Sequence, residues 1–367
     1  MQRFKKILVV IDENTKEGAV VERAIDLARR NDAHISLVSA IDKPSHSRPE
    51  QQVAEALAES DGPGIDIIED WPPTADPASA PEQPPLWDQS AGRESLEAND
   101  RPTTLPDVLM RESVLEAESQ RLDQWADVVR RSDLSVEIKI LSGVPFLEII
   151  REVLRQEHDL VMTTAKGRTS LRERFFGSTT MHLMRKCPCP VWVVKRTQPD
   201  WQSRLRAAVD PNPPDQERHA LSVKSMDLAT SLARQKQSEL VVVHTWTFTV
   251  ERSLRSGHLS LSDDLDSWVA DTRNQHRPWL ADLLEPYALE ELKHEVYLLK
   301  GEPGRLIPEV ATAKDAQLIV MGTVSRTGVS GLLIGNNAER ILGLVDCAVL
   351  AVKPDGFETP VQLKGKG

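Results

Sequence analysis

The stretch VEIKILSGVP at Val136–Pro145 returns 158 residues later as HEVYLLKGEP at His294–Pro303. Two more pairs share this spacing: DLVMTT at Asp159–Thr164 with QLIVMG at Gln317–Gly322, and CPVWVVK at Cys189–Lys195 with CAVLAVK at Cys347–Lys353. Three matches at one constant spacing indicate an internal duplication. We therefore expect two copies of one folding unit, with domains at residues 1–198 and 199–367.

Short apolar runs alternate with helical patterns in both copies. The runs KILVVID, ending at Asp12, and LRAAVD, ending at Asp210, are typical of buried strands that lead into a loop. Second strands are expected at His34–Ala40 and Glu239–Thr245. Alternating strands and helices predict an α/β fold with parallel sheets covered by helices on both faces. Ligands of such sheets lie at the carboxyl ends of the strands, where Asp12 and Asp210 stand.

The first copy carries a proline-rich insertion at Gly62–Pro106, which holds nine of the 24 prolines. So many prolines disfavour helix and central strand, and the insertion is predicted to be a disordered surface loop. Its tryptophans, Trp71 and Trp87, either dock the loop onto a groove or are incidental to a solvated segment.

The composition excludes several classes of protein. The formal net charge of −11 disfavours a nucleic-acid groove and gives no support for binding to anionic membranes. The sequence holds no apolar run of about 18 residues, the length that a membrane-spanning helix needs. Three cysteines in 367 residues fit a reducing compartment, so a cytoplasmic location is expected.

In each copy the fourth strand leads into a glycine-bearing loop. The loop of the second copy starts at Gly322 and ends at Gly335-Asn336, and that of the first copy ends at Gly177-Ser178. Glycine lets a backbone approach phosphate closely, and the free N–H groups of a helix N-terminus attract anions. With an acid after the first strand, these parts could cradle a nucleotide. In the alternative reading the glycines serve only as turns and the acids only as helix caps.

The spacing Gly, two residues, Gly, nine residues, Gly-Ser/Thr resembles the ATP-binding loop of universal stress proteins. This resemblance implies two tandem Rossmann-like domains, each a parallel five-stranded sheet with helices on both faces. It also implies that the domains pair through their fifth strands, Val191–Lys195 and Ala348–Lys353, and so form a pseudo-dimer within one chain. The whole protein is then expected to be a monomer or a homodimer. The implied role is non-enzymatic support of survival under stress, including DNA damage.

Neither copy keeps the whole motif. Thr164 stands at the first glycine of the first copy, while Ser325 and Asn336 replace the second glycine and the Ser/Thr of the second copy. ATP binding is therefore predicted to be weak, with a slight preference for the second copy. The candidate contacts are Asp210, Met321, Gly322, Ser325, Gly335 and Asn336 in the second copy, and Asp12, Thr164, Gly167, Gly177 and Ser178 in the first.

The remaining motifs give weaker indications of function. No metal site and no catalytic residue is predicted, and Cys187-Pro-Cys189 is interpreted as packing before the fifth strand. A local run of basic residues is interpreted as a solvated face, with an anion or partner patch as the alternative; it comprises Arg172, Arg174, Arg185, Lys186 and Arg196. The sequence does not decide whether the protein binds a small molecule or an unknown protein partner. The alternatives are an ATP-binding protein with weak ATPase activity and a binder of an apolar or lipid-like ligand.

Overall fold

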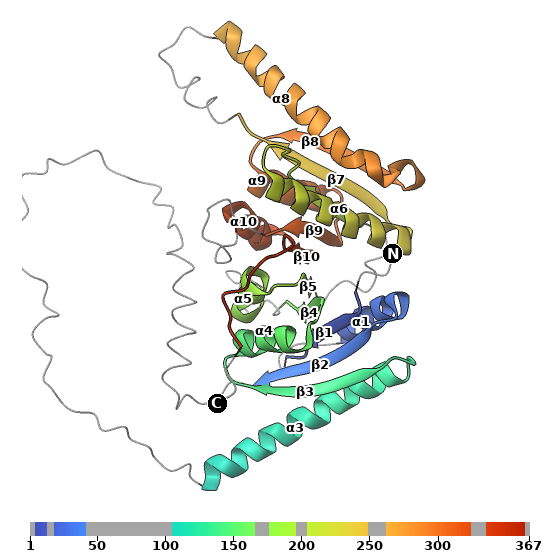
Figure 1. The fold of residues 1–367 in the computed structure, drawn as a ribbon, viewed down its shortest axis with the longest axis vertical. Helices are drawn as coiled ribbons and strands as arrows, with labels where there is room; N and C mark the ends of the chain where they lie inside the picture. Colours follow the sequence, from blue (N-terminus) through green and yellow to red (C-terminus); the bar gives the residue numbers. More distant parts are fainter. Residues whose placement is uncertain are drawn as a thin grey trace, which may run out of the picture. The chain divides into compact units, whose positions relative to one another are not determined.

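The structure is a computed structural model, and it describes residues 4–12, 18–41, 105–165, 176–195, 204–248, 262–323 and 335–363 (Figure 1). The strands are β1 Lys6–Val10, β2 His34–Ile41, β3 Val136–Ser142, β4 Leu160–Thr164, β5 Val191–Val194, β6 Arg204–Val209, β7 Glu239–Trp246, β8 His294–Lys300, β9 Leu318–Gly322 and β10 Ala348–Val352. The main helices are α1 Gly18–Asn31, α3 Leu105–Arg130, α4 Pro145–Gln156, α5 Ser178–Lys186, α6 Gln216–Lys236, α8 Ser262–Leu284, α9 Pro303–Ala313 and α10 Asn336–Leu344.

The chain divides into two units, residues 1–61 with 118–367, and residues 62–117. All ten strands belong to the first unit. The expected insertion, with Trp71 and Trp87, lies outside the described residues except at its end. There the prediction of a loop to Pro106 is wrong, because α3 already begins at Leu105. A proline in the first helical turn lacks only an N–H that would have no helical partner, so it fits this start.

The ten strands form one sheet in the order β3-β2-β1-β4-β5-β10-β9-β6-β7-β8. The pairs within each half are parallel, whereas β5 and β10 are antiparallel and join the halves. Val193 pairs with Val349 and Trp192 with Leu350 along this seam. Both strands are fully buried, as a central position requires. The predicted pairing through the fifth strands is confirmed.

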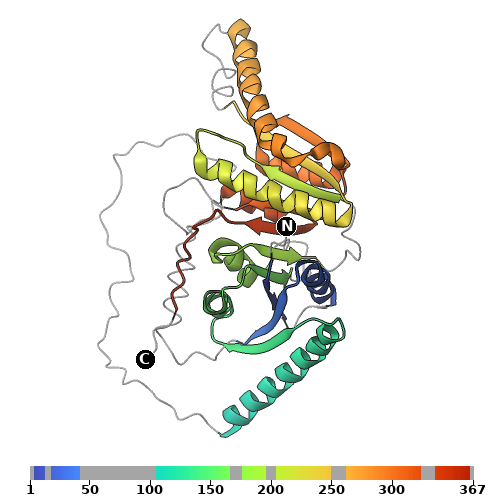
Figure 2. The same ribbon diagram turned by 45° about the vertical axis from the view of Figure 1, so that its right-hand side comes forward.

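Helices cover both faces of the sheet and enclose two cores (Figure 2). The α1/α6 face holds α1, α6, α8 and the C-terminal half of α3, and the α4/α9 face holds α4, α5, α9 and α10. Strand residues alternate between the cores: Ile7 and Val9 face α1, while Leu8 and Val10 face α4. No described helix is long and apolar enough to cross a membrane.

The strand register shows that the two halves are structurally equivalent. Ile7 pairs with Leu160 in the first half, and Leu205 pairs with Leu318 at the corresponding point of the second. Asp12 lies five residues after Ile7, and Asp210 lies five residues after Leu205. The two acids therefore occupy equivalent positions after the first strand of each half. This is the arrangement that the duplication predicts.

Polar contacts reinforce the seam between the halves. Arg185 of α5 pairs with Glu339 of α10 at 2.7 Å, and Lys195 donates to the carbonyl oxygen of Val345 at 2.7 Å. On the other face, Lys236 at the end of α6 pairs with Asp26 of α1 at 2.5 Å. The halves are thus held by side-chain contacts on both faces as well as by the ladder.

The C-terminal segment returns from the second half to the first. Val361 is buried in the core of the α4/α9 face, and Arg151 Nε of α4 donates to the carbonyl oxygen of Gln362 at 3.2 Å. Near its start, Asp355 pairs with Lys224 of α6 at 2.6 Å. This segment, residues 354–363, is called the C-terminal strap below.

Candidate functional site

Asp210, the acid of the second half, already has hydrogen-bond partners within the protein. Asp210 follows β6, and its Oδ2 accepts a hydrogen bond from Arg218 Nη1 at 3.1 Å. Its backbone N–H donates to Ser222 Oγ at 3.0 Å. Asp210 does not cap α6, because Asp215 does so by accepting from the backbone N–H of Arg218 at 3.2 Å. A ligand hydroxyl at Asp210 would therefore compete with Arg218.

The glycine that ends β9 makes room for a side chain of the protein itself. A Cβ added at Gly322 would lie 2.3 Å from Leu221 Cδ2 and 2.8 Å from its Cγ. Both distances are far below ordinary contact, so any residue other than glycine forces Leu221 to move. Leu221 belongs to α6, and Met321 is buried in the core of the α4/α9 face. The space beside Gly322 is thus filled from within the chain.

The two glycines that precede the last helices differ in conformation. Gly177, the N-cap of α5, has φ 83° and ψ 150°, a region that is almost exclusive to glycine. Gly335, the N-cap of α10, has φ −65° and ψ 140°, which any residue can adopt. Asn336 is the first helical residue and is exposed, and α10 has no side-chain cap. Asn336 therefore does not cap this helix.

The structure brings only part of the predicted first-half site together. Thr164 is buried at the end of β4 and pairs with Val194 in the ladder. Asp12 is half-buried after β1, and Ser178 is exposed at the start of α5. Gly167 and Ser325 lie outside the described residues, so the middle of neither loop is described.

A pair of histidines beside Asp210 escaped the sequence reasoning. His244 of β7 is fully buried, and its Nε2 lies 2.9 Å from Nδ1 of His276 in α8. The His276 ring stacks on Trp246 at 6.0 Å between centroids and meets the edge of Trp279 at 4.9 Å. The internal duplication could have revealed the pair, because the first half also carries polar residues at the two places that correspond to His244 and His276.

Those places are Ser39 on β2 and Glu118 on α3. Ser39 Oγ donates to Glu118 Oε2 at 2.7 Å, and Arg121 Nη2 donates to the same oxygen at 2.5 Å. Both halves therefore tie their second strand to the following long helix through a buried polar contact, and they use different chemistry for it.

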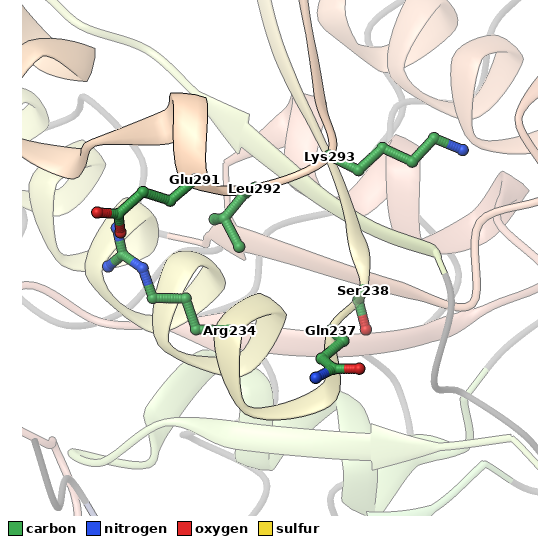
Figure 3. A pocket seen from close by; sticks show the side chains of 6 residues that line it. All are labelled: Arg234, Gln237, Ser238, Glu291, Leu292 and Lys293. Carbon is green, nitrogen blue, oxygen red and sulfur yellow. The ribbon is translucent and has the colours of Figure 1, made fainter.

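A separate cavity of about 370 Å³ opens at the other end of the second-half strands. Ser238 and Lys293 stand just before β7 and β8, so the cavity lies at the amino edge of the sheet, away from Asp210. The Lys293 side chain points away from Arg234 (Figure 3). Arg234 Nη2 donates to the carbonyl oxygen of Tyr287. The lining is Arg234, Gln237, Ser238, Glu291, Leu292 and Lys293. This mixed, open lining does not select a ligand.

The basic run does not form one solvated face. Lys186 is fully buried, with Nζ 3.1 Å from His182 Nδ1, and Arg185 pairs with Glu339 across the seam. The remaining arginines of the run, Arg172, Arg174 and Arg196, lie outside the described residues. The interpretation of a solvated face is therefore wrong for Lys186, whose stem packs in the interior.

The Cys-Pro-Cys motif lies in the core. Cys187 and Cys189 are both buried, with their sulfurs 3.5 Å apart. The hydrogen bond to Cys187, together with burial, raises the pKa of the Cys189 thiol well above its ordinary value. In the part of the chain that the structure describes, no three His, Cys, Asp or Glu side chains come together as a metal site. The position before β5 fits a packing role.

Two equivalent α/β halves, joined through their fifth strands and each with an acid after its first strand, define a tandem α/β protein with pseudo-two-fold symmetry. The chain belongs to the universal stress protein family, since the family model described as "Universal stress protein family" matches residues 3–195 and 207–353.

Its similarity extends to named members of the family. It is 32% identical to universal stress protein E of Escherichia coli K12 over 286 residues, covering 76% of this chain and 86% of that protein. It is 25% identical to a universal stress protein E homolog of Haemophilus influenzae over 251 residues, covering 67% and 78%. The family and these relatives give the chain a role in the stress response.

Solved structures share the fold. A protein of Pseudomonas aeruginosa PAO1 described as functionally unknown aligns with a TM-score of 0.63 at 22% identity, covering 96% of this chain and 94% of that one. A universal stress protein of Archaeoglobus fulgidus aligns with a TM-score of 0.57 at 14% identity, covering 95% and 96%. At these identities the likeness concerns the fold alone.

Proposed function

We propose that this protein acts in the cytoplasmic stress response by binding a small ligand or a protein partner rather than by catalysis, and that its affinity for ATP is low. The observation that carries the proposal is the contact between Leu221 and Gly322. Gly322 is the glycine that the family resemblance assigns to the nucleotide, and the chain has filled the space beside it.

The cost of opening this site comes mainly from the leucine. Burial of a whole leucine side chain contributes roughly 1.5–3 kcal/mol, and Leu221 is half-buried, so its displacement costs a fraction of that. The Arg218–Asp210 pair is partly exposed, and such pairs contribute about 0–1 kcal/mol. A nucleotide at the second half must offset both terms before it gains any net affinity.

The polar groups at this edge favour binding over chemistry. Asp210 is paired with Arg218, and both ring nitrogens of His244 are hydrogen-bonded. A general base needs a free lone pair within reach of a substrate proton. His244 therefore offers no free lone pair, and the Asp210 carboxylate is held by its ion pair with Arg218.

The proposal includes a slight preference of ATP for the second half, and support of survival under stress that includes DNA damage. The preference is supported by the retained Gly322 and Gly335, and the survival role is supported by the family resemblance. Survival of a deletion strain after ultraviolet exposure, with and without the gene supplied again, tests the cellular part. Equal survival of the deletion strain and its parent would contradict it.

Native mass spectrometry of the freshly purified full chain tests the molecular part. We expect a mass without nucleotide, or with a different ligand. A stoichiometric ATP adduct would contradict the proposal, and release of inorganic phosphate from added ATP would favour a weak ATPase instead. A retained lipid would favour the alternative of an apolar ligand.

Matched loop variants identify the half that is responsible for any ATP binding. Ser325→Gly should strengthen it, and Gly335→Asp should abolish it by placing a carboxylate at the helix N-terminus. Loss of binding with Gly177→Asp but not with Gly335→Asp would assign the site to the first half instead.

A further inference from the structure

The protons of the His244–His276 pair can be assigned from geometry. His244 Nδ1 lies 3.1 Å from the carbonyl oxygen of Val209, which can only accept, so this nitrogen carries a proton. In neutral His244 the Nε2 atom is then an acceptor, and His276 Nδ1 donates to it at 2.9 Å. The contact holds as long as one proton lies between the two rings.

This arrangement accepts one additional proton but not two. A proton added at His276 Nε2 leaves the hydrogen bond between the rings intact. A second added proton puts N–H groups on both facing nitrogens, 2.9 Å apart, and makes both rings cationic. The contact must then break, because two donors and two like charges face each other in a largely buried place.

The contact lies where α8 meets the rest of the second half. Leu280 and Leu283, on the C-terminal side of His276, are buried in the core. On its N-terminal side the side chains at 267–275 are mostly exposed, with Trp268 at 39%. Figure 2 shows α8 in orange running past the end of the sheet. His276 is thus the outermost polar anchor of α8 among these residues.

We propose that the His244–His276 pair is an acid-sensitive latch: proton uptake by both rings breaks the contact between them and releases the part of α8 around His276 from β7. The first half has no such latch, because Ser39 and Glu118 make the corresponding contact without an imidazole. The inference does not depend on whether ATP binds.

Burial sets the direction of the response, and the charge of Asp210 opposes it. Asp210 faces the pair from the end of β6, and Arg218 of α6 balances its charge. Burial, opposed by Asp210, lowers the pKa of His276 below its ordinary value; burial also lowers the pKa of His244. The neutral pair therefore stabilises the fold above pH about 6.5, and this stability is lost as the pH falls below that value.

Hydrogen exchange of the full chain at pH 7.5 and pH 5.0, corrected for intrinsic exchange rates, tests the latch. We expect the protection of α8 around residues 267–279 to fall more than that of residues 118–130 of α3, because only α8 is held by a contact that two added protons break. His276→Asn keeps an N–H donor at the place of Nδ1 and does not titrate, so it should abolish the difference.

Two results would overturn the inference. One is a wild-type α8 that loses no more protection than α3, and the other is a His276→Asn protein that loses as much as the wild type. If His276→Asn fails to fold, nuclear magnetic resonance titration of the wild-type imidazoles decides. Two midpoints of which the lower lies below 6.5 support the latch, because the second proton is the one that breaks the contact, and midpoints at or above 6.5 for both rings contradict it.

Discussion

Leu221 Cδ2 lies 2.3 Å from the place where a Cβ of residue 322 would stand, and Gly322 has none. The family resemblance gives this glycine to a nucleotide, whereas the structure gives the space to a leucine of α6. A glycine at a motif position can thus be retained for packing inside the protein. The contact also makes the site testable, because each partner can be changed separately.

Gly322→Ala should lower the free energy of unfolding by about 1–3 kcal/mol, as overpacking of a filled site does. Leu221→Ala should remove most of that penalty, so the double variant should be more stable than the sum of the two single effects. Urea unfolding of the four proteins measures this coupling. A Gly322→Ala protein as stable as the wild type would show that Leu221 does not hold the space.

The two N-cap glycines should respond differently to the same change. Gly177→Ala should cost about 1–3 kcal/mol, because φ 83° with ψ 150° is strained for any residue with a Cβ. Gly335→Ala, at φ −65°, is the matched control and should cost far less. Thermal unfolding of both variants compares them, and equal losses would contradict the difference in conformation.

The C-terminal strap should stabilise the first half through Val361. Val361 is 4% exposed and Leu363 is 49% exposed, so the two provide a buried and an exposed position two residues apart. Val361→Asp should lower the free energy of unfolding by about 2–4 kcal/mol, since it buries an unpaired charge or detaches the strap. Leu363→Asp should change it by no more than about 0.5 kcal/mol. Similar losses for both variants would show that the strap is not docked.

Lys353 should make stability depend on pH in the alkaline range. Burial lowers the pKa of Lys353 from its ordinary 10.5 to about 7. The unfolded chain therefore binds more protons between pH 7 and 10.5, and the free energy of unfolding should rise with pH across this window. Lys353 is 1% exposed, its Nζ donates to the carbonyl oxygen of Arg185 at 3.0 Å, and the Phe357 ring centroid lies 4.8 Å away.

Lys353→Met should flatten this dependence and stabilise the protein at pH 7 by about 1–3 kcal/mol, as replacing buried charge with apolar groups often does. Urea unfolding at pH 7 and pH 10 measures both effects. A variant that is destabilised equally at the two pH values would instead show that the hydrogen bond to Arg185 outweighs the cost of burial.

The sequence predicted the frame of the fold because repetition and apolar runs are local signals. The constant spacing identified Val191–Lys195 and Ala348–Lys353 as equivalent strands, the family resemblance implied that they pair, and the ladder places Val193 opposite Val349. It was not enough to find contacts that depend on helix placement. The apolar pattern of a helix does not say that Leu221 fills the space beside Gly322.

The polar pair was missed for a similar reason. His244 and His276 are 32 residues apart, and His276 stands in a helix whose N-terminal part is mostly exposed, so no local pattern marks it. Nothing in the sequence of the C-terminal strap shows that Val361 returns to the first half. Long-range burial of this kind becomes visible only in three dimensions.

Calorimetric titration of Mg·ATP into the wild type, Ser325→Gly and the Leu221→Ala, Ser325→Gly double variant tests the central claim most directly. We predict a wild-type Kd weaker than about 100 µM, equivalent to a binding free energy less favourable than about −5.5 kcal/mol. Affinity should then increase stepwise, by roughly five- to thirtyfold for each 1–2 kcal/mol recovered, as the loop regains its glycine and Leu221 is removed. Micromolar or tighter binding by the wild type, unchanged in the double variant, would contradict the claim that the chain itself occupies this site.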